Sequence, residues 1–397
     1  MKPRPLLVIF FIVFVDLLGF GLIIPILPLF AQELGASEAV VGLVAASFSV
    51  MQFLFGPFWG GLSDRYGRKP VLMASMVLMG GSYLLFAHAH TLWWLFVSRL
   101  LAGIAAANIS AAQAYISDIS EPANRAKNFG IIGAAFGLGF IVGPPVGGFL
   151  KDHLGVEWVG YAAAAFSFIN LGLCALLLRE SLAVKNTSKA LFSNPLKEIF
   201  SVLRRDTLQQ MMVLNLVFIT AFSMMQITST LLWAGKYGLT GTQIGYLFLF
   251  IGVLAAIFQG FLVGPLNRRF GERKLLINGI VLMMIGLALM PLPTQAYFIP
   301  VQLLALGLIS LGNAFLTPTL SSLLSKVAAP GEQGLLMGTA QSFGSLGRVL
   351  GPILGGLLYG LHPILPFEIS ALLMASCIAL ALGLLAKPAI RAVMNPI

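Results

Sequence analysis

The sequence predicts an all-α membrane protein with twelve transmembrane helices in two related six-helix halves. Three observations lead to this prediction. Hydrophobic residues make up 58% of the 397 residues and charged residues only 10%, whereas soluble domains carry about 25% charged residues. The apolar residues gather in twelve long runs. Finally, one charged segment and one Gly-Pro segment each recur once, 204 and 208 residues later.

Each apolar run has about the 20 residues that a helix needs to cross the hydrocarbon core of a bilayer. Backbone groups in lipid must bond within the chain, so the runs are expected to be helices and not strands. The runs cover 6–30, 38–60, 71–89, 92–115, 127–150, 158–178, 210–233, 242–265, 275–293, 298–322, 334–358 and 364–386. A polar, basic segment separates six from six, which predicts an N-terminal half at 1–178, a linker at 179–209 and a C-terminal half at 210–397.

The basic residues predict the orientation of the chain. Placing the N-terminus inside the cell puts 20 of the 24 Lys and Arg residues in cytoplasmic segments, and leaves only Lys151 and Lys236 in outer loops. Cytoplasmic loops of membrane proteins carry such an excess of Lys and Arg. We therefore expect both termini in the cytoplasm. The net charge of +10 belongs to these loops and does not indicate nucleic-acid binding.

The two repeated segments relate the halves. The segment 60–69 (GGLSDRYGRK), between the second and third runs, matches 264–274 (GPLNRRFGERK) between the eighth and ninth. The segment 143–148 (GPPVGG) in the fifth run matches 351–356 (GPILGG) in the eleventh. Duplicated halves in transporters place a substrate site at their interface and open it alternately to each side.

Four motifs lie in the helices where one known family carries them. They are the loop 60–69, Leu95-x-x-x-Arg99-x-x-x-Gly103 in the fourth run, Gly133-x-x-x-Gly137-x-Gly139-x-x-x-Gly143-Pro144-x-x-Gly147-Gly148 in the fifth, and 16–28 (DLLGFGLIIPILP) in the first. Over essentially its whole length the chain resembles the drug:proton antiporter branch of the major facilitator superfamily. Its first run is similar to helix 1 of tetracycline exporters and their relatives.

The resemblance implies a monomeric, multi-pass transporter of the bacterial inner membrane that exports small amphipathic molecules. A proton gradient supplies the energy, and no cofactor is implied. Two departures concern the drug. Tetracycline exporters carry an acid in helix 3 just before a Tyr-Leu-Leu sequence, whereas this chain has Ser82 before Tyr83-Leu84-Leu85. They also carry an acid in helix 9, whereas the run 275–293 of this chain has none. The resemblance therefore implies the branch and not a tetracycline–metal chelate as substrate.

Asp16 and Arg99 are the candidates for proton coupling. A charge at mid-bilayer costs about 2.5–3.5 kcal/mol even on insertion scales, so such residues are few. Burial disfavours an ionised carboxyl group, which lets Asp16 take up a proton on one side and release it on the other. Arg99 keeps its charge, and could act on a neighbouring acid or bind an anionic group. A structural role in a polar network is the alternative for both.

The charged loop predicts a latch. In the family's arrangement, Asp64 would accept hydrogen bonds from the amino end of helix 11, and Arg68 would bridge to Asp118 at the foot of helix 4. The alternative is that the bases only orient the chain. That alternative does not explain the acid, which the second copy replaces with Arg268. The predicted gating residues are Gly60, Asp64, Arg65, Gly67, Arg68 and Asp118.

The Gly-Pro run of the fifth helix predicts a hinge or a tight interface between the halves, because small residues let helices approach and proline permits bending. Its residues are Gly139, Gly143, Pro144, Gly147 and Gly148. Polar residues in several runs are candidates for substrate contact, although such residues also join helices to one another. They are Gln52, Asn108, Gln113, Asn215, Gln226, Asn313 and Arg348. For Arg348 the alternatives are an anionic substrate group and a charge partner.

The function that fits best is export of amphipathic small molecules by proton antiport. A proton-coupled importer or a transporter of lipid-like substrates on the same scaffold is the first alternative. A membrane enzyme or a sensor is the remote one, because the runs hold no His/Asp/Glu cluster and the chain has no soluble domain. The expected partners are the substrate, protons and the lipid bilayer. Cys174 and Cys377 lie in apolar runs and predict neither a disulfide framework nor a metal site.

Overall fold

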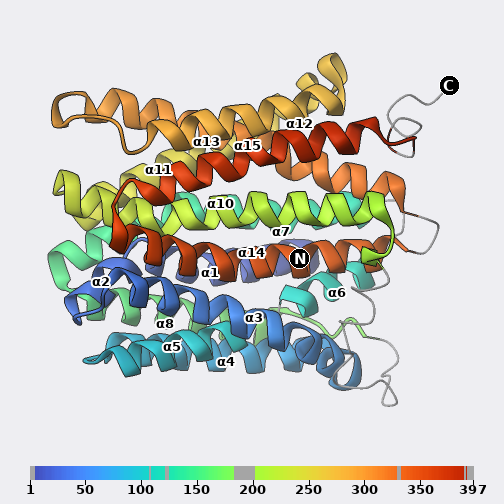
Figure 1. The fold of residues 1–397 in the computed structure, drawn as a ribbon. Coiled ribbons are helices and arrows are strands. Elements are labelled where there is room, and N and C mark those ends of the chain that lie inside the picture. Colours follow the sequence, from blue (N-terminus) through green and yellow to red (C-terminus); the bar gives the residue numbers. More distant parts are fainter. Residues whose placement is uncertain are drawn as a thin grey trace. The chain divides into compact units, whose positions relative to one another are not determined.

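The computed structural model of the protein describes residues 5–106, 109–120, 125–182, 202–328, 332–388 and 390. Every regular element in these residues is helical (Figure 1). The elements are α1 (Pro5–Ile23), α2 (Leu27–Glu33), α3 (Glu38–Tyr66), α4 (Arg68–Ala87), α5 (Leu92–Ala106), α6 (Ile109–Ile119), α7 (Arg125–Leu154), α8 (Val156–Leu177), α10 (Asp206–Tyr237), α11 (Gly241–Ile257), the π-helix η2 (Phe258–Leu262), α12 (Val263–Leu289), the 3₁₀ helix η3 (Gln295–Tyr297), α13 (Phe298–Val327), α14 (Gln333–Leu361) and α15 (Leu365–Ala386). Asn108 and most of the predicted linker lie outside the described residues.

The predicted all-α membrane fold is confirmed. Each of the twelve apolar runs lies mainly in helix, and nine stretches of the described residues are long and apolar enough to cross a membrane. One of the nine, Gly241–Leu289, has 49 residues, which is more than two crossings need. It holds two of the predicted runs and departs from helical geometry at Gly271. The other two runs lie in α7 and α14, which have 30 and 29 residues.

The first predicted run is broken by proline. Residues 24–26 form a turn between α1 and α2, and Pro25 stands at its centre. Proline has no backbone N–H to donate and disfavours helical geometry in the residue before it. By contrast, Pro144 and Pro352, in the repeated Gly-Pro segments, lie inside continuous helices.

The chain forms two compact units, Met1–Ser193 with Gly238–Gly252, and Asn194–Tyr237 with Val253–Ile397. In the first unit, α1 packs on α7 and α8, while α4 packs on α5 and α8. In the second, α10 packs on α14 and α15, while α12 packs on α13 and α15. These are the same helix pairs, counted from the start of each half, so the duplication seen in the sequence extends to the packing. The predicted boundaries at 178 and 210 stay a prediction.

Glycines of the repeated Gly-Pro segments make close helix contacts in both units. A Cβ atom on Gly147 of α7 would lie 2.2 Å from the carbonyl oxygen of Leu22 in α1. A Cβ atom on Gly351 of α14 would lie 2.7 Å from the carbonyl oxygen of Thr220 in α10. Only glycine permits backbones to approach so closely. Gly139 and Gly143 also contact α1, so these three residues of the predicted hinge form a tight interface within their unit.

Candidate functional site

The charged loop forms a tight junction between α3 and α4. Gly67 separates the two helices with φ +111° and ψ 159°, a backbone conformation essentially restricted to glycine. A Cβ atom at this position would also lie 2.4 Å from Oε2 of Glu180. Gly67 is therefore required both for its backbone conformation and for the space that it leaves to the Glu180 carboxylate.

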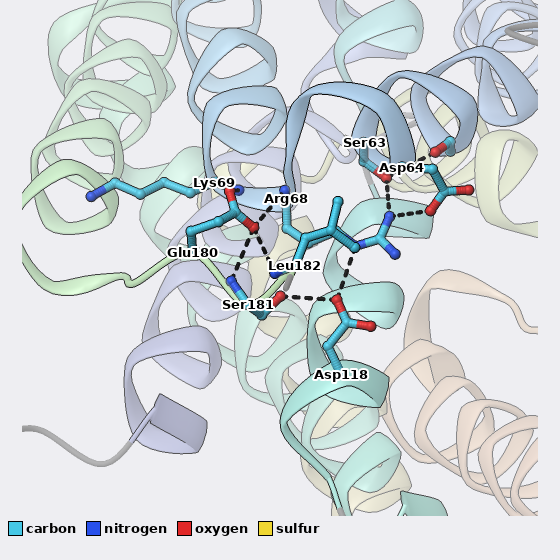
Figure 2. A network of polar contacts seen from close by, with 9 residues as sticks. Ser63, Asp64, Arg68, Lys69, Asp118, Glu180, Ser181 and Leu182 are labelled. Atoms are coloured by element: carbon cyan, nitrogen blue, oxygen red, sulfur yellow. Dashed lines mark hydrogen bonds and ion pairs between the residues drawn. The ribbon is translucent and has the colours of Figure 1, made fainter. Parts of the chain in front are cut away.

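The guanidinium group of Arg68 joins three helix ends (Figure 2). Its Nη1 donates to Ser63 Oγ at 2.7 Å and to Asp64 Oδ1 at 2.5 Å, and its Nε donates to Asp118 Oδ2 at 3.0 Å. The residue is 6% exposed, so these contacts lie largely out of water. The two carboxylates thus neutralise the buried arginine. Together with the hydroxyl group, they accept hydrogen bonds from its guanidinium group and hold it in place.

Glu180 holds the amino end of α4. Its Oε1 accepts the backbone N–H of Arg68 at 2.9 Å, and its Oε2 accepts that of Lys69 at 3.1 Å. A carboxylate at this place satisfies amide groups that have no partner within the helix and complements the helix dipole. Partial burial acts to raise the pKa of Glu180, but hydrogen bonds from four backbone amides outweigh it and leave that pKa below its usual value.

The end of α8 and the segment after it complete the network. Ser181 Oγ donates to Asp118 Oδ2 at 2.9 Å, and Lys69 Nζ donates to the carbonyl oxygen of Ala175 at 2.7 Å. We call Ser63, Asp64, Arg68, Lys69, Asp118, Glu180 and Ser181 the loop network (Figure 2). The sequence analysis did not predict Glu180 or Ser181. The available signal was an acid directly after Arg179, at the start of a largely basic stretch, which resembles the signal that marked Asp64.

The structure brings together four of the six predicted gating residues, Asp64, Gly67, Arg68 and Asp118. The carbonyl oxygen of Gly60 accepts a hydrogen bond from Ser63 Oγ at 2.9 Å, one step away from the guanidinium group. Arg65 instead lies over the ring of Tyr66, 5.8 Å from its centroid. The predicted contact between Asp64 and the start of α14 joins the two units and stays a prediction.

The second copy of the loop has the same backbone but a different pair of charges. Gly271, at the position of Gly67, has φ +75° and ψ 161°. Glu272, at the position of Arg68, is 8% exposed. Its Oε1 accepts hydrogen bonds from Ser322 Oγ at 2.6 Å and from Lys326 Nζ at 2.9 Å. The sequence analysis compared the two loops but missed this pair, which the 208-residue offset would have found by relating Lys326 to Asp118.

Within the first unit, three polar residues lie deep in the helices, and we call them the Asp16 cluster: Asp16, Tyr83 and Arg99. Tyr83 and Arg99 are each 2% exposed, whereas Asp16 is partly exposed. Asp16 and Arg99 both act electrostatically on the Tyr83 hydroxyl. The ring of Tyr83 lies against Gly19, one turn after Asp16. Tyr83 was not predicted as a site residue.

Much of the hydrogen-bonding capacity of this cluster is unused. Among the described residues, no acceptor meets Nε or Nη2 of Arg99, and no partner meets the Tyr83 hydroxyl. The Arg99 guanidinium instead lies over the ring of Phe86, 5.3 Å from the centroid. Buried polar groups are nearly always hydrogen-bonded, and exceptions point to a functional role or a bound water. Such groups can bond to a carboxylate that changes its protonation state.

The neutral candidates for substrate contact divide by their bonds. Gln52 Nε2 donates to the Ala106 carbonyl oxygen at 3.3 Å, and Asn215 Nδ2 donates to that of Ala340 at 2.9 Å, so both join helices. Asn313 Oδ1 accepts from Thr317 Oγ1, one turn later in α13, at 3.2 Å. Gln226 is partly exposed and Gln113 is exposed. Asn108 lies outside the described residues.

At the other end of the helices, α7 meets the beginning of α11. Asp152 Oδ1 accepts the backbone N–H of Gly241 at 3.0 Å, and its Oδ2 accepts that of Thr242 at 2.7 Å. A Cβ atom on Gly148 would lie 2.2 Å from the Gly241 carbonyl oxygen. We call Asp152 with these two amides the α7–α11 clasp. Lys151 pairs with Glu33 beside it, at 2.8 Å. The sequence analysis predicted Gly148 but not Asp152.

In the described part of the chain, no three His, Cys, Asp or Glu side chains are grouped as a metal site would require. The carboxylates described above are bonded to arginine, lysine or backbone amides, apart from Asp16. The arrangement is therefore one of charged helix junctions around a single intramembrane acid. Chemically, such an arrangement can bind a proton at Asp16 and hold helix ends together through ion pairs and hydrogen bonds.

Comparisons with known proteins identify the family of the chain. A family model described as Major Facilitator Superfamily matches residues 9–262 and 211–394. The class C tetracycline resistance protein of Escherichia coli is 32% identical over 366 residues, covering 89% of each chain. Multidrug resistance protein 1 of Bacillus subtilis (strain 168) is 32% identical over 375 residues, covering 93% of each. The crystal structure of the human organic anion transporter MFSD10 (TETRAN) matches with a TM-score of 0.72 and 27% identity, covering 95% of this chain and 99% of that one.

Proposed function

The chain belongs to the major facilitator superfamily, as a multi-pass drug-efflux transporter of its tetracycline and multidrug branch, and from this premise we propose that it exports amphipathic small molecules in exchange for protons. The observation that carries the proposal is the Asp16 cluster. Asp16 is the one acid in the interior of an apolar run, since Glu38 and Glu368 stand in first turns of helices. A partly exposed carboxyl group in such a place can exchange protons with water.

The buried groups around Asp16 give each protonation state a different set of bonds. The ionised carboxylate attracts the fixed charge of Arg99 and can accept a hydrogen bond from the Tyr83 hydroxyl. The protonated carboxyl group keeps no net charge, so its attraction to Arg99 falls and the helix that carries it is released. Proton uptake thereby favours one arrangement of α1 against α4 and α5, and proton loss favours the other. A difference in energy between two conformations is what coupling requires.

We assign the loop network to gating on the cytoplasmic side. Seven segments that the excess of Lys and Arg assigns to the cytoplasm include the loop between α3 and α4 and the segment after α8. Because Arg68, Asp118 and Glu180 bind three helix ends to one another, these ends move as one body. This assignment places both termini on the cytoplasmic side of a bacterial inner membrane and the α7–α11 clasp on its outer side.

The similar bacterial proteins are named for resistance to tetracycline and to multiple drugs, which supports a drug-like, amphipathic substrate. Ser82, 0% exposed, stands where tetracycline exporters carry an acid, and no acid lies in the ninth run. We therefore expect no transport of a tetracycline–metal chelate. A proton-coupled importer or a transporter of lipid-like substrates is the alternative, because the direction of transport depends on coupling and not on the fold.

The experiment is uphill transport in proteoliposomes with an imposed pH gradient, with the fluorescent cation rhodamine 6G as the probe. We expect the parent protein to concentrate the dye against its gradient until an ionophore removes the pH difference. Asp16→Asn should abolish uphill transport and keep downhill exchange. Glu368→Gln, which removes an exposed acid from the first turn of α15, is the control and should behave as the parent does.

Two results would contradict the proposal. Uphill transport by the Asp16→Asn variant at the parent's rate would show that this carboxyl group does not carry the coupled proton. A parent protein that moves no amphipathic dye outward, but accumulates one inward with protons, would favour the import alternative.

A further inference from the structure

Arg348 is a positive charge in the middle of a membrane helix. It lies 15 residues after the first residue of α14 and 13 before the last. At about 1.5 Å per residue, it is roughly 20 Å from either end of the helix. An arginine this far from both ends cannot extend its side chain to the membrane surface, and such residues face a cavity or a partner inside the protein.

No acid of its own half can neutralise Arg348. In the C-terminal half, residues 210–397, the sequence has only three acids, Glu272, Glu332 and Glu368. Glu272 binds Lys326, and Glu332 binds Arg205 through Nη1 at 2.6 Å and Nη2 at 2.7 Å. Glu368 is exposed in the first turn of α15. All three stand at helix ends.

The bonds of Arg348 leave most of its donors available. Nη2 donates to Ser345 Oγ, one turn earlier, at 2.9 Å, and this is the only hydrogen bond of the guanidinium group among the described residues. Gly344 lies beside the group and places no side chain against it. A Cβ atom there would lie 3.7 Å from both Arg348 Nη1 and Asn215 Nδ2. The side chain is only partly buried.

We infer that Arg348 binds the acidic group of an amphipathic organic anion, as a carboxylate, sulfonate or phosphate. This inference rests on the proposed function and adds an anionic class of substrate to it. The planar fork of arginine donates two parallel hydrogen bonds to an oxyanion, and the Ser345 hydroxyl is positioned beside it as a further donor. The oxyanion brings the missing negative charge, while the apolar part of the substrate lies against the helices.

The test compares two xanthene dyes of similar ring structure and opposite charge, fluorescein and rhodamine 6G, bound to the purified protein in nanodiscs. Arg348→Gln should weaken fluorescein binding about tenfold or more, and leave rhodamine 6G binding unchanged or stronger. Arg348→Lys keeps the charge but not the fork, so it should weaken fluorescein binding less. Arg269→Gln removes an exposed arginine that lies over Phe270 and should match the parent with both dyes.

If Arg348→Gln weakened the binding of both dyes equally, with unchanged thermal unfolding, the inference would be overturned in favour of a structural role. Unchanged binding of both dyes would overturn it too. If the Gln variant does not fold, the Lys variant decides, because it must bind fluorescein more weakly than the parent while rhodamine 6G binds equally. These measurements need no proton gradient. Failure of uphill transport would therefore contradict the proposed function and leave the anion site intact.

Discussion

Glu272 Oε1 and Lys326 Nζ lie 2.9 Å apart, at the positions that Arg68 and Asp118 occupy in the first half. The repeat offsets of 204 and 208 residues relate Glu272 to Arg68 and Lys326 to Asp118. Each half thus joins its charged loop to the foot of its fourth helix by an ion pair, but the base and the acid have exchanged places. Both halves therefore keep a pair of opposite charges at these two positions, but the sign of the charge at each position differs between the halves.

Exchanging the charges of this pair should therefore be tolerated. Lys326→Gln leaves the largely buried Glu272 carboxylate with Ser322, and Glu272→Gln leaves Lys326 without its ion pair. Each should lower the free energy of unfolding by about 1 kcal/mol, a modest value because the lysine side chain is 45% exposed and water screens it. The double variant Glu272→Lys, Lys326→Glu should recover at least half of that loss. Unfolding of each purified protein in detergent measures these differences.

The Ser322 hydroxyl can donate to a carboxylate or accept from an ammonium group, so the exchanged pair keeps its third member. If the double variant were as unstable as the sum of its single variants, the two side chains would act independently and the ion pair would not hold the loop.

The two loop glycines provide a matched comparison. Gly67 and Gly271 share a backbone conformation that is essentially restricted to glycine, and alanine there should cost about 1–3 kcal/mol in the free energy of unfolding. A Cβ atom at Gly271 meets no described atom within 4 Å, whereas one at Gly67 meets Glu180 Oε2 at 2.4 Å. Gly67→Ala should therefore be the more destabilising. Measured unfolding of both variants tests this difference.

The excess cost at Gly67 should fall when the carboxylate is removed. In a Glu180→Ala background, the further change Gly67→Ala should cost no more than Gly271→Ala costs in the parent. An excess that persisted there would mean that Glu180 does not set the packing at this junction.

Much of the architecture could be predicted from composition and the repeats, because long apolar runs identify membrane helices in a sequence. The site followed only in part. Arg68 and Asp118 were predicted to meet, because the resemblance to the family implied that contact. Tyr83 and Asp152 were missed, because a tyrosine in an apolar run and an acid in an outer loop are both ordinary. Only the packing places the first beside Gly19 and the second at the amino end of α11.

The α7–α11 clasp should depend on the ionised form of Asp152, which lies beyond the apolar run 127–150. Partial burial acts to raise the pKa of Asp152, but hydrogen bonds from the Thr242 backbone and from neighbouring donors outweigh it and hold that pKa below 3.8. A carboxyl group whose pKa is lower in the folded state stabilises that state above its unfolded pKa, and this stabilisation is lost as pH falls through the folded pKa.

Asp152→Asn should therefore speed hydrogen exchange at the backbone amides of Gly241 and Thr242 about two- to fivefold at neutral pH, the effect of weakening a helix cap. The difference from the parent should shrink as the pH falls through the lowered pKa of Asp152, because the parent's carboxyl group then becomes protonated as well. Exchange measured by mass spectrometry on the peptide that begins α11 tests this. His153→Ala, next along the helix, is the control. A parent-to-variant ratio that stayed constant with pH would exclude the ionised carboxylate as the cause.

Replacing Tyr83 with phenylalanine separates structure from coupling. The Tyr83 hydroxyl is buried and meets no hydrogen-bond partner among the described residues, so removing it should leave the free energy of unfolding unchanged or raise it by about 1 kcal/mol. If the hydroxyl donates to the ionised Asp16 carboxylate during the cycle, its removal destabilises that form. The pH at which uphill dye transport is half-maximal should then move upward. Unfolding and transport measured on the same preparation distinguish the cases. If the hydroxyl group had only a structural role, its removal would lower the free energy of unfolding and leave the pH midpoint of transport unchanged.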